Sequence, residues 1–390
     1  MSERELLMIP GPVVFDPEVL RALSAPSPSH GSPEFIRTFG SVMRRLREVC
    51  RAPSAQPFVM AGSGTLAMEM AVANLIEPGD RVAVACSGYF SDRAATILER
   101  HGAELTHVRA PLGEAPTREQ LDSALSAGRY KAVAITHVDT STGVRADVQG
   151  LVAAARSHGA LSIVDGVCAT GGERFDQDAW GADVYLTASQ KALGVPPGLG
   201  LLTVSPRGME AWRRRRSPVR SVYMDFAEWL PVHEAYEAGK AGYFATPAVN
   251  LITALEVSLR QILDEGMEKR FARHELCARA FRAAWRAMGL QLVPRSEAVA
   301  ANTLSAVYLP NGVDGSLVGR VREEGVIITG GLHPEIKARC FRVGHMNAVN
   351  PSDVLATVGA IERALAKVGH KVDPGAAVAA AQKIFAERGG

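Results

Sequence analysis

The sequence predicts an α/β protein with a large domain, built on a mostly parallel sheet, and a smaller α+β domain near the C-terminal end. From residue 57 to about 205, short apolar runs rich in β-branched residues alternate with amphipathic helical patterns. After residue 250 the pattern changes to long helices and a few short strands. The chain has 390 residues, which is long enough for two domains.

Six strands and three helices are expected in the large domain, and their alternation is typical of a parallel sheet with helices on both faces. The strands are "QPFVMAG" (56–62), "RVAVACS" (81–87), "KAVAITHVD" (131–139), "LSIVDGV" (161–167), "DVYLTAS" (183–189) and "GLGLLTVS" (198–205). The helices are "TLAMEMAVANLIEPGD" (65–80), which stops at its Pro-Gly pair, "SDRAATILERHGA" (91–103) and "VQGLVAAARSHGA" (148–160).

The smaller domain is expected to follow one long amphipathic helical region, residues 249–289, that breaks near Gly266. Three strand-like pieces and a helix come next: "NTLSAVYLP" (302–310), "GVIITGG" (325–331), "CFRVGHM" (340–346) and "PSDVLATVGAIERALAKVG" (351–369). We therefore expect an N-terminal segment at residues 1–20, the large domain at 21–255 and the small domain at 256–390.

The composition excludes several classes of protein. The net charge is +2, so nothing indicates binding to nucleic acid or to an anionic membrane, and the run "WRRRRSPVR" (212–220) is expected to be a solvated helix face. The five cysteines form neither a CxxC pair nor a zinc-ligand spacing, so we expect no disulfide framework and no metal. The N-terminal stretch is not a signal peptide, and no apolar run reaches membrane-spanning length. A reducing cytoplasm fits best.

Polar residues follow several of the expected strands, at the edge where open parallel sheets bind ligands. Gly62-Ser63-Gly64-Thr65 lies between a strand and a helix, where free amide groups can bind an anion. The pattern also resembles a dinucleotide fingerprint, but the next strand ends in Cys86-Ser87 and lacks the acid that would bind a ribose. The sequence therefore favours a phosphate site without a nucleoside, with a plain helix N-cap as the alternative.

Three more segments contain residues that could carry chemistry. Asp165 ends the strand "LSIVDGV", where a carboxylate needs a cation or several hydrogen bonds, unless it is a structural aspartate bonded to turn amides. The loop "THVDTSTGV" is either part of a site or a turn rich in small polar residues, and it contains Asp139, Thr140, Ser141 and Thr142. Lys191 lies between two apolar runs, where it is either an ordinary loop lysine or one held for its chemistry.

One hypothesis joins these residues. Pyridoxal phosphate needs a phosphate site, an acid that protonates its ring nitrogen and a lysine that forms an imine. Asp165 and Lys191 are 191 − 165 = 26 residues apart, which leaves room for one strand–helix–strand unit and lets both reach one crevice. Asp165 would then keep the pyridinium protonated, and desolvation would lower the pKa of Lys191 for Schiff-base formation.

Motifs along nearly the whole chain resemble the class V aminotransferases, a family of fold-type I pyridoxal-phosphate enzymes, and within it the alanine–glyoxylate and serine–pyruvate aminotransferases. The motifs are "IPGP" (9–12), "AGSGTLAMEMA" (61–71), "SGYFSDR" (87–93), "THVDTSTGV" (136–144), "IVDGV" (163–167), "SQKALGVPPG" (189–198), "GYFATP" (242–247) and "GGLHPEIKARCFRVGHM" (330–346). The "SQK", "VDG" and "FRVGH" blocks indicate this family only in combination, since none of them would suffice alone. The resemblance implies a seven-stranded sheet in the large domain.

The resemblance also implies roles for single residues. Lys191 becomes the Schiff-base lysine and the general acid/base, and Asp165 pairs with the ring nitrogen. The other implied cofactor contacts are the stacking Phe90, Thr140 near the ring 3-oxygen, and Ser63, Gly64, Thr65 and Gln190 at the phosphate.

The resemblance further implies that Tyr243 and Thr246 contact the phosphate from the other subunit of a homodimer with shared sites. Arg342 is implied to bind the substrate α-carboxylate, because a bidentate guanidinium suits a planar carboxylate. Gly11 belongs to an N-terminal segment over the active site, where its smallness would admit only compact substrates. Taken singly, Phe90 and Tyr243 could instead be core aromatics and Arg342 a structural arginine.

The implied activity is transfer of an amino group from a small L-amino acid, alanine or serine, to glyoxylate or pyruvate. The alternatives are an aminotransferase for ureidoglycine, hydroxykynurenine or aminoethylphosphonate, or a lyase of the cysteine desulfurase type. A non-catalytic regulator is disfavoured, because the chain leaves no residues for a DNA-binding domain. The chain departs from many relatives at His30-Gly31, where they carry His-Arg, and this difference bears on the substrate.

Overall fold

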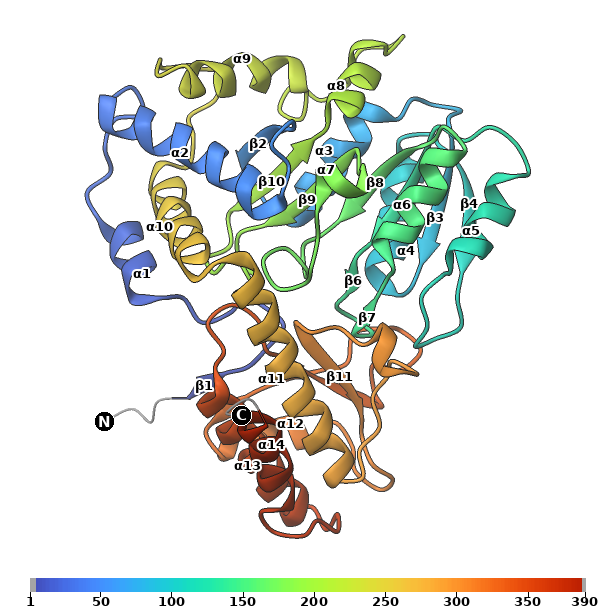
Figure 1. Cartoon of the computed structure of the whole chain (residues 1–390), viewed down its shortest axis with the longest axis vertical. Coiled ribbons are helices and arrows are strands. Elements are labelled where there is room, and N and C mark those ends of the chain that lie inside the picture. The colour runs from blue at the N-terminus through green and yellow to red at the C-terminus, as the bar shows by residue number, and fades with distance from the viewer. Residues whose placement is uncertain (1–4, 388–390) are drawn as a thin grey trace.

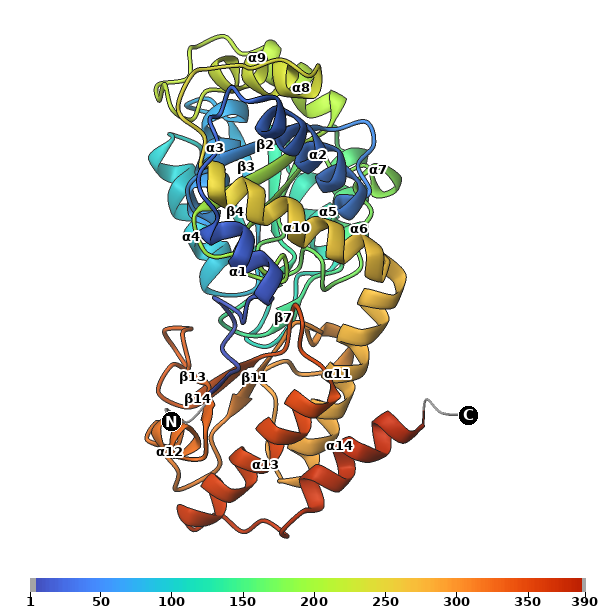
Figure 2. The same cartoon turned by 90° about the vertical axis from the view of Figure 1, so that its left-hand side faces the viewer.

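The computed structural model describes residues 5–387 and has two parts (Figure 1). The larger part holds a seven-stranded sheet between helices, and the smaller part holds a short sheet with helices packed on it (Figure 2). Residues 1–4 of the expected N-terminal segment and residues 388–390 lie outside the described residues. Between residues 5 and 387, none of the helices combines the length and apolar character that a membrane crossing requires.

The strands of the large sheet lie in the order β2-β10-β9-β8-β5-β3-β4. Their bounds are β2 (Gln56–Ala61), β3 (Arg81–Cys86), β4 (Glu104–Arg109), β5 (Ala132–Thr136), β8 (Leu161–Asp165), β9 (Val184–Ala188) and β10 (Leu199–Val204). β10 is antiparallel to both of its neighbours, and the other four adjacent pairs are parallel. The prediction of a mostly parallel seven-stranded sheet is confirmed.

Two details of the sheet differ from the strand pattern of the sequence. β4 is missing from the six strands expected from apolar runs, because it is an edge strand in which only Val108 is buried. β10 runs antiparallel because the ten-residue connection from β9, residues 189–198, contains no helix. A parallel return needs a longer crossover, usually through a helix. Lys191 belongs to this short connection, so it lies just beyond the C-terminal end of β9.

Helices cover both faces of the large sheet. One face packs against α2 (Pro33–Cys50), α5 (Arg118–Leu125), α6 (Val148–Ser157) and α10 (Val249–Glu265). The opposite face packs against α3 (Gly64–Leu75), α4 (Tyr89–Arg100), α8 (Pro206–Arg213) and the start of α9 (Phe226–Glu237). α1 (Pro17–Ser24) packs on α10, and α7 (Gln177–Trp180) is a single turn. The expected helix face at residues 212–220 is wrong beyond Arg213, where α8 ends ahead of Pro218.

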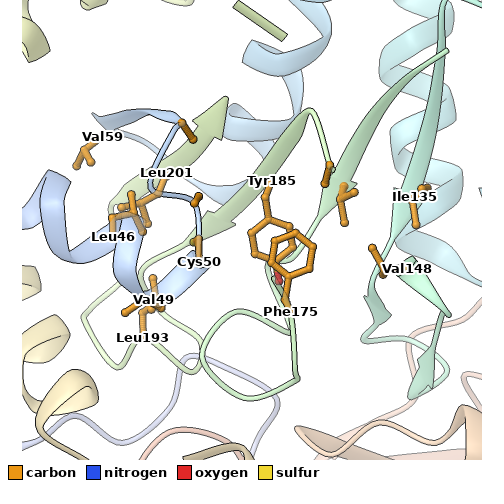
Figure 3. Close-up of a cluster of buried hydrophobic side chains, with 14 of the residues drawn as sticks. Leu46, Val49, Cys50, Val59, Ile135, Val148, Phe175, Tyr185, Leu193 and Leu201 are labelled. Carbon is orange, nitrogen blue, oxygen red and sulfur yellow. The ribbon is translucent and has the colours of Figure 1, made fainter. Parts of the chain in front are cut away.

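The core reaches up to the strand end that carries Asp165. In the cluster of Figure 3, the ring of Tyr185 on β9 stacks on Phe175, with centroids 3.7 Å apart. Gly166 follows Asp165, and a Cβ atom there would lie 2.1 Å from the Tyr185 ring. The glycine therefore lets the aromatic core close directly beneath the end of β8.

The small domain has a three-stranded antiparallel sheet in the order β11-β14-β13. Its elements are β11 (Leu304–Tyr308), β13 (Thr329–Gly330), β14 (Cys340–Gly344), α11 (Met267–Ala287), α12 (Leu317–Glu323), α13 (Pro351–Lys367) and α14 (Ala376–Ala386). The expected break in the long helical region is confirmed: α10 ends at Glu265, and Gly266 has a φ of 83°.

The N-terminal segment connects the two parts of the molecule. β1 (Leu6–Leu7) pairs in parallel with β12 (Val326–Ile327) of the small domain. The Gly344 amide then donates to the Met8 carbonyl at 2.8 Å, and the Val13 amide donates to the Gln190 carbonyl at 3.2 Å. The segment therefore crosses from the small domain to the loop of Lys191 before α1 begins.

We predict that Gly266→Ala lowers the free energy of unfolding by about 1 kcal/mol, because a side chain disfavours the left-handed backbone at this break. Gly319→Ala is the matched control, since this glycine lies inside α12 without positive φ and with open space around it. The control should stabilise by roughly 0.5–1 kcal/mol. Denaturation midpoints measure both changes, and equal effects would contradict the strain argument.

Candidate active site

A cavity of about 240 Å³ lies at the carboxyl ends of β5 and β8. Ligands of open α/β sheets bind at this edge. The residues that line the cavity are Ser63, Gly64, Thr65, Met68, Phe90, Arg93, Val138, Thr140, Asp165, Val167, Cys168, Gln190 and Lys191. Eight of them are residues that the sequence analysis assigns to a cofactor, so the fold brings together side chains from five separate segments.

The start of α3 forms one end of the cavity. Ser63 is the N-cap and accepts a hydrogen bond from the Leu66 amide at 3.3 Å, so the N-cap interpretation is correct as local structure. The amides of Gly64 and Thr65 have no acceptor among residues 5–387. A Cβ atom on Gly64 would lie 2.7 Å from the Val167 side chain, so glycine is needed for close packing here. Free amides at a helix start suit an anionic group.

Gln190 adds an unpaired polar group at the same cavity. Its side-chain oxygen is buried and has no hydrogen-bond partner among the described residues. A buried amide without a partner is costly, and an amide can turn over to present its donor instead of its acceptor. The chemistry of this end of the cavity therefore fits a bound anion such as a phosphate group.

Asp165 is a buried carboxylate with one unused oxygen. Its Oδ1 accepts a hydrogen bond from the Val167 amide at 2.9 Å, and no donor among residues 5–387 bonds to Oδ2. Burial raises the pKa of this carboxyl to about 6, and the charge of Asp139 adds to the rise, while Lys191 and Arg93 lower it. Asp165 lines the cavity, and a carboxylate with an oxygen that accepts no hydrogen bond is suited to a cationic N–H group.

Lys191 faces the same cavity from the loop between β9 and β10. The loop is held by Ser189, whose hydroxyl donates to the Pro196 carbonyl at 2.8 Å and accepts from the Leu199 amide at 3.2 Å. The Lys191 ammonium donates to the Pro10 carbonyl of the N-terminal segment. Burial lowers the pKa of Lys191, which favours the neutral, nucleophilic amine.

Gly11 packs directly against this lysine. Its φ is 104°, and a Cβ atom would lie 2.6 Å from the Lys191 Cδ atom. The sequence analysis relates the smallness of Gly11 to substrate size. In the fold, the absence of a side chain at Gly11 also leaves room for Lys191, because the three atoms nearest to an added Cβ atom all belong to this lysine.

Arg342 reaches the site from the small domain. It lies on β14, the middle strand, and donates to the Gly330 carbonyl at 3.0 Å and to the Thr140 carbonyl at 3.2 Å. Within residues 5–387, no carboxylate lies within 4.0 Å of its guanidinium. Arg342 is not among the lining residues of the cavity, but its hydrogen bond to Thr140 places it beside them as an unpaired cation.

Tyr243 and Thr246 lie apart from the cavity in this chain. Tyr243 is 66% exposed, its hydroxyl lies 3.4 Å from that of Thr246, and its ring centroid is 5.4 Å from that of His30. Their assigned role requires a second subunit.

The sequence analysis names Asp139 as a position that could carry chemistry but gives it no specific role, and it does not single out Arg93. The fold places both next to Phe90. The Arg93 guanidinium lies 4.8 Å from the Phe90 ring centroid and donates to the Thr65 hydroxyl at 3.1 Å. Arg93 is three residues after Phe90 on one helix, so helical spacing was the signal for this contact. The contact of Asp139 with α4 is made by tertiary hydrogen bonds, for which the sequence gives no signal.

We predict that Asp165→Asn stabilises the cofactor-free protein at pH 7. The pKa of this carboxyl rises from its ordinary 3.8 to about 6, so native stability falls as the pH rises from about 4 through 6. Asparagine keeps the acceptor for the Val167 amide and carries no charge. The gain should be on the order of 3 kcal/mol at pH 7 and nearly vanish near pH 4. Thermal denaturation across this range measures it, and parallel pH profiles of the two proteins would contradict it.

Comparison with known proteins agrees with this geometry. Residues 22–352 match the family described as aminotransferase class V. The chain is 39% identical over 356 residues to alanine–glyoxylate aminotransferase 1 of Saccharomyces cerevisiae, covering 88% of this chain and 92% of that protein.

Two solved structures are similar over nearly the full length. The pyridoxamine–pyruvate aminotransferase of Mesorhizobium loti has a TM-score of 0.93 at 30% identity, covering 99% of this chain and 98% of that one. The ureidoglycine–glyoxylate aminotransferase of Bacillus subtilis has a TM-score of 0.92 at 28% identity, covering 99% of both chains. The chain therefore belongs to the class V aminotransferases and catalyses transamination with pyridoxal phosphate.

Proposed function

We propose that this enzyme moves the amino group of alanine or serine to glyoxylate or pyruvate, working as a cytoplasmic homodimer with shared active sites. The observation that carries the proposal is the meeting of Lys191 and Asp165 in one cavity beside the free amides of α3. The similarity to a yeast alanine–glyoxylate aminotransferase supports the choice of substrates.

The residues of the cavity fit the parts of the cofactor. Ser63, Gly64, Thr65 and Gln190 would hold the phosphate, with the start of α3 supplying amide donors. Asp165 would bind the protonated ring nitrogen through its free oxygen, and Phe90 would pack on the ring. Thr140 would lie near the ring 3-oxygen. When bound, pyridoxal phosphate supplies an electron-withdrawing ring that makes the α-hydrogen of an amino acid acidic.

Lys191 would hold the cofactor covalently and then move the proton. Burial lowers the pKa of Lys191, which favours the neutral amine that can take the α-proton. The neighbouring Gly11 and Pro10 of the N-terminal segment restrict the access of water to this amine. The same amine can then return this proton on the cofactor side, which completes the proton transfer that transamination requires.

Arg342 would bind the α-carboxylate of donor and acceptor. It is a cation without a carboxylate partner among the described residues, and its two hydrogen bonds to carbonyl groups fix its orientation. The close approach of Gly11 to Lys191 supports a compact substrate.

A homodimer would complete the site with Tyr243 and Thr246 of the second subunit. Among residues 5–387, Tyr243 and Val222 are two of the four exposed large hydrophobic side chains, at 66% and 67%. Contact with another subunit would cover them. Cys50, Cys86, Cys168 and Cys340 are free and buried, which fits a reducing cytoplasm.

Ureidoglycine is the second candidate donor, because an aminotransferase for it has a TM-score of 0.92 against this chain. Hydroxykynurenine and aminoethylphosphonate remain alternatives from the sequence. A desulfurase activity is disfavoured. It needs a cysteine on a mobile loop, whereas Cys340 is buried in β14 and burial raises its pKa.

We predict that adding L-alanine or L-serine removes the absorbance band of the bound cofactor and that adding glyoxylate restores it. L-Aspartate and L-cysteine are the comparison donors. Lys191→Ala should abolish multiple turnovers, whereas Lys269→Ala, at an exposed position of α11, should not. A cofactor band that no donor changes would overturn the substrates, and turnover by the Lys191 variant would overturn the role of the lysine.

A mixing experiment tests the shared site. Lys191→Ala and Tyr243→Ala should each be inactive or nearly so. After the subunits are exchanged, one of the two sites in each heterodimer carries both native residues. Activity should therefore return to about a quarter of the wild-type level, because half of the dimers are mixed. No recovery after demonstrated subunit exchange would contradict the contribution of Tyr243 to the partner's site.

A further inference from the structure

The site contains a second buried aspartate that the proposed mechanism does not use. Asp139 is 0% exposed and lies at the end of β6 (Val138–Asp139), which forms a hairpin with β7 (Val144–Arg145). Among residues 5–387, no Lys, Arg or His nitrogen lies within 4.0 Å of its oxygens. A buried carboxylate without a cation needs several hydrogen bonds, and the groups that donate these bonds are held in place by the carboxylate.

The hydrogen bonds of Asp139 converge on the start of α4. Its Oδ2 accepts from the backbone amides of Phe90 at 3.0 Å and Ser91 at 3.3 Å. Its Oδ1 accepts from the amide and the hydroxyl of Ser141, at 3.0 and 2.5 Å. The Ser141 hydroxyl in turn accepts from the Tyr89 amide at 3.0 Å. Three consecutive amides of the first turn of α4 are therefore held by this one hairpin.

The close packing of this carboxylate against α4 depends on Gly88. Gly88 is the N-cap of α4, and a Cβ atom there would lie 2.6 Å from the Asp139 Cγ atom and 2.7 Å from the Ser141 hydroxyl oxygen. Only glycine allows the hairpin to approach the helix so closely. The anchor is thus built by both elements, and it fixes the residue two positions into α4, which is Phe90.

The anchor also distinguishes the two helices that begin at the cavity. The first amides of α4 are occupied by the Asp139 side chain, whereas those of Gly64 and Thr65 in α3 have no acceptor among the described residues. Two helix starts could both attract the phosphate of the cofactor. With Asp139 in place, only the start of α3 remains available, and α4 presents the Phe90 ring instead.

We propose that Asp139 is a positioning residue for the cofactor: it anchors the first turn of α4 and thereby fixes the Phe90 ring at the wall of the cavity. The inference rests on the proposed packing of Phe90 against the cofactor ring. Asp139 itself does not line the cavity, so it acts through Phe90 and not by contact with the ligand.

The test uses the purified holoenzyme and two readouts besides activity. These are the circular dichroism of the bound cofactor band, which reports the orientation of the ring, and the rate of cofactor release after dilution. Asp139→Asn keeps the size of the side chain but removes its charge. It should weaken the dichroic band and speed cofactor release on the order of tenfold, as expected for weakened charge-assisted hydrogen bonds. Should this variant fail to fold, Ser141→Ala keeps the carboxylate, removes one anchor and should act in the same direction.

A matched control separates positioning from general stability. Asp183 is also a buried carboxylate, but it accepts from the Ser162 amide at the opposite end of the sheet. Asp183→Asn should lower the melting temperature without changing the cofactor band or its release. If it changes both as Asp139→Asn does, the effect is general destabilisation and the proposal is wrong.

A double mutant tests whether Asp139 acts through Phe90. Phe90→Leu alone should also speed cofactor release, and Asp139→Asn should add little in that background. If Phe90→Leu leaves the cofactor unchanged, the proposed packing of Phe90 fails, and this inference fails with it. If Phe90→Leu has its effect but Asp139→Asn has none, or if the two effects multiply fully, only the positioning role of Asp139 is overturned.

Discussion

The burial of two ionisable groups, Asp165 and Lys191, in one cavity is the constraint on which the site depends. Burial raises the pKa of the acid and lowers that of the amine, so each is moved toward its neutral form. Neither group would be kept there for stability, because uncompensated burial of charge is unfavourable. The surrounding fold must therefore supply rigid support on all sides. The aromatic core beneath β8 and the hydrogen-bonded loop of Lys191 provide it.

The two aspartates of the site show how the environment separates their roles. Both aspartates are buried, and each is the last residue of a strand: Asp139 of β6 and Asp165 of β8. Asp139 uses both oxygens for hydrogen bonds within the protein, whereas Asp165, which lines the cavity, accepts one and keeps one oxygen free. A saturated carboxylate can hold a helix in place, and an unsaturated one can bind a ligand. The count of donors, rather than the residue type, distinguishes the two.

The cavity lies where the two parts of the molecule meet. Arg342 of the small domain bonds to Thr140 of the large domain, and the N-terminal segment pairs with β12 before it reaches Lys191. Relative movement of the two parts would therefore change the surroundings of the Lys191 amine and of Arg342 together. This coupling suits an enzyme that must admit a substrate and then exclude water from the reacting atoms.

The sequence by itself determined the alternation of strands and helices, the break at Gly266 and the family, because these depend on local apolar periods, on backbone conformation and on motifs in a fixed order. It also selected Asp165 and Lys191, since an acid at a strand end and a lysine between apolar runs are conspicuous in one dimension. Only the tertiary structure decided that β10 turns back antiparallel, that the polar edge strand β4 joins the sheet and that Gly11 packs on Lys191. It alone joined Asp139 to α4, because hydrogen bonds between residues 49 positions apart leave no trace in local composition. The sequence analysis placed Tyr243 and Thr246 in the site from resemblance, and a single chain leaves them outside, since such a contact is a property of an assembly and not of one fold.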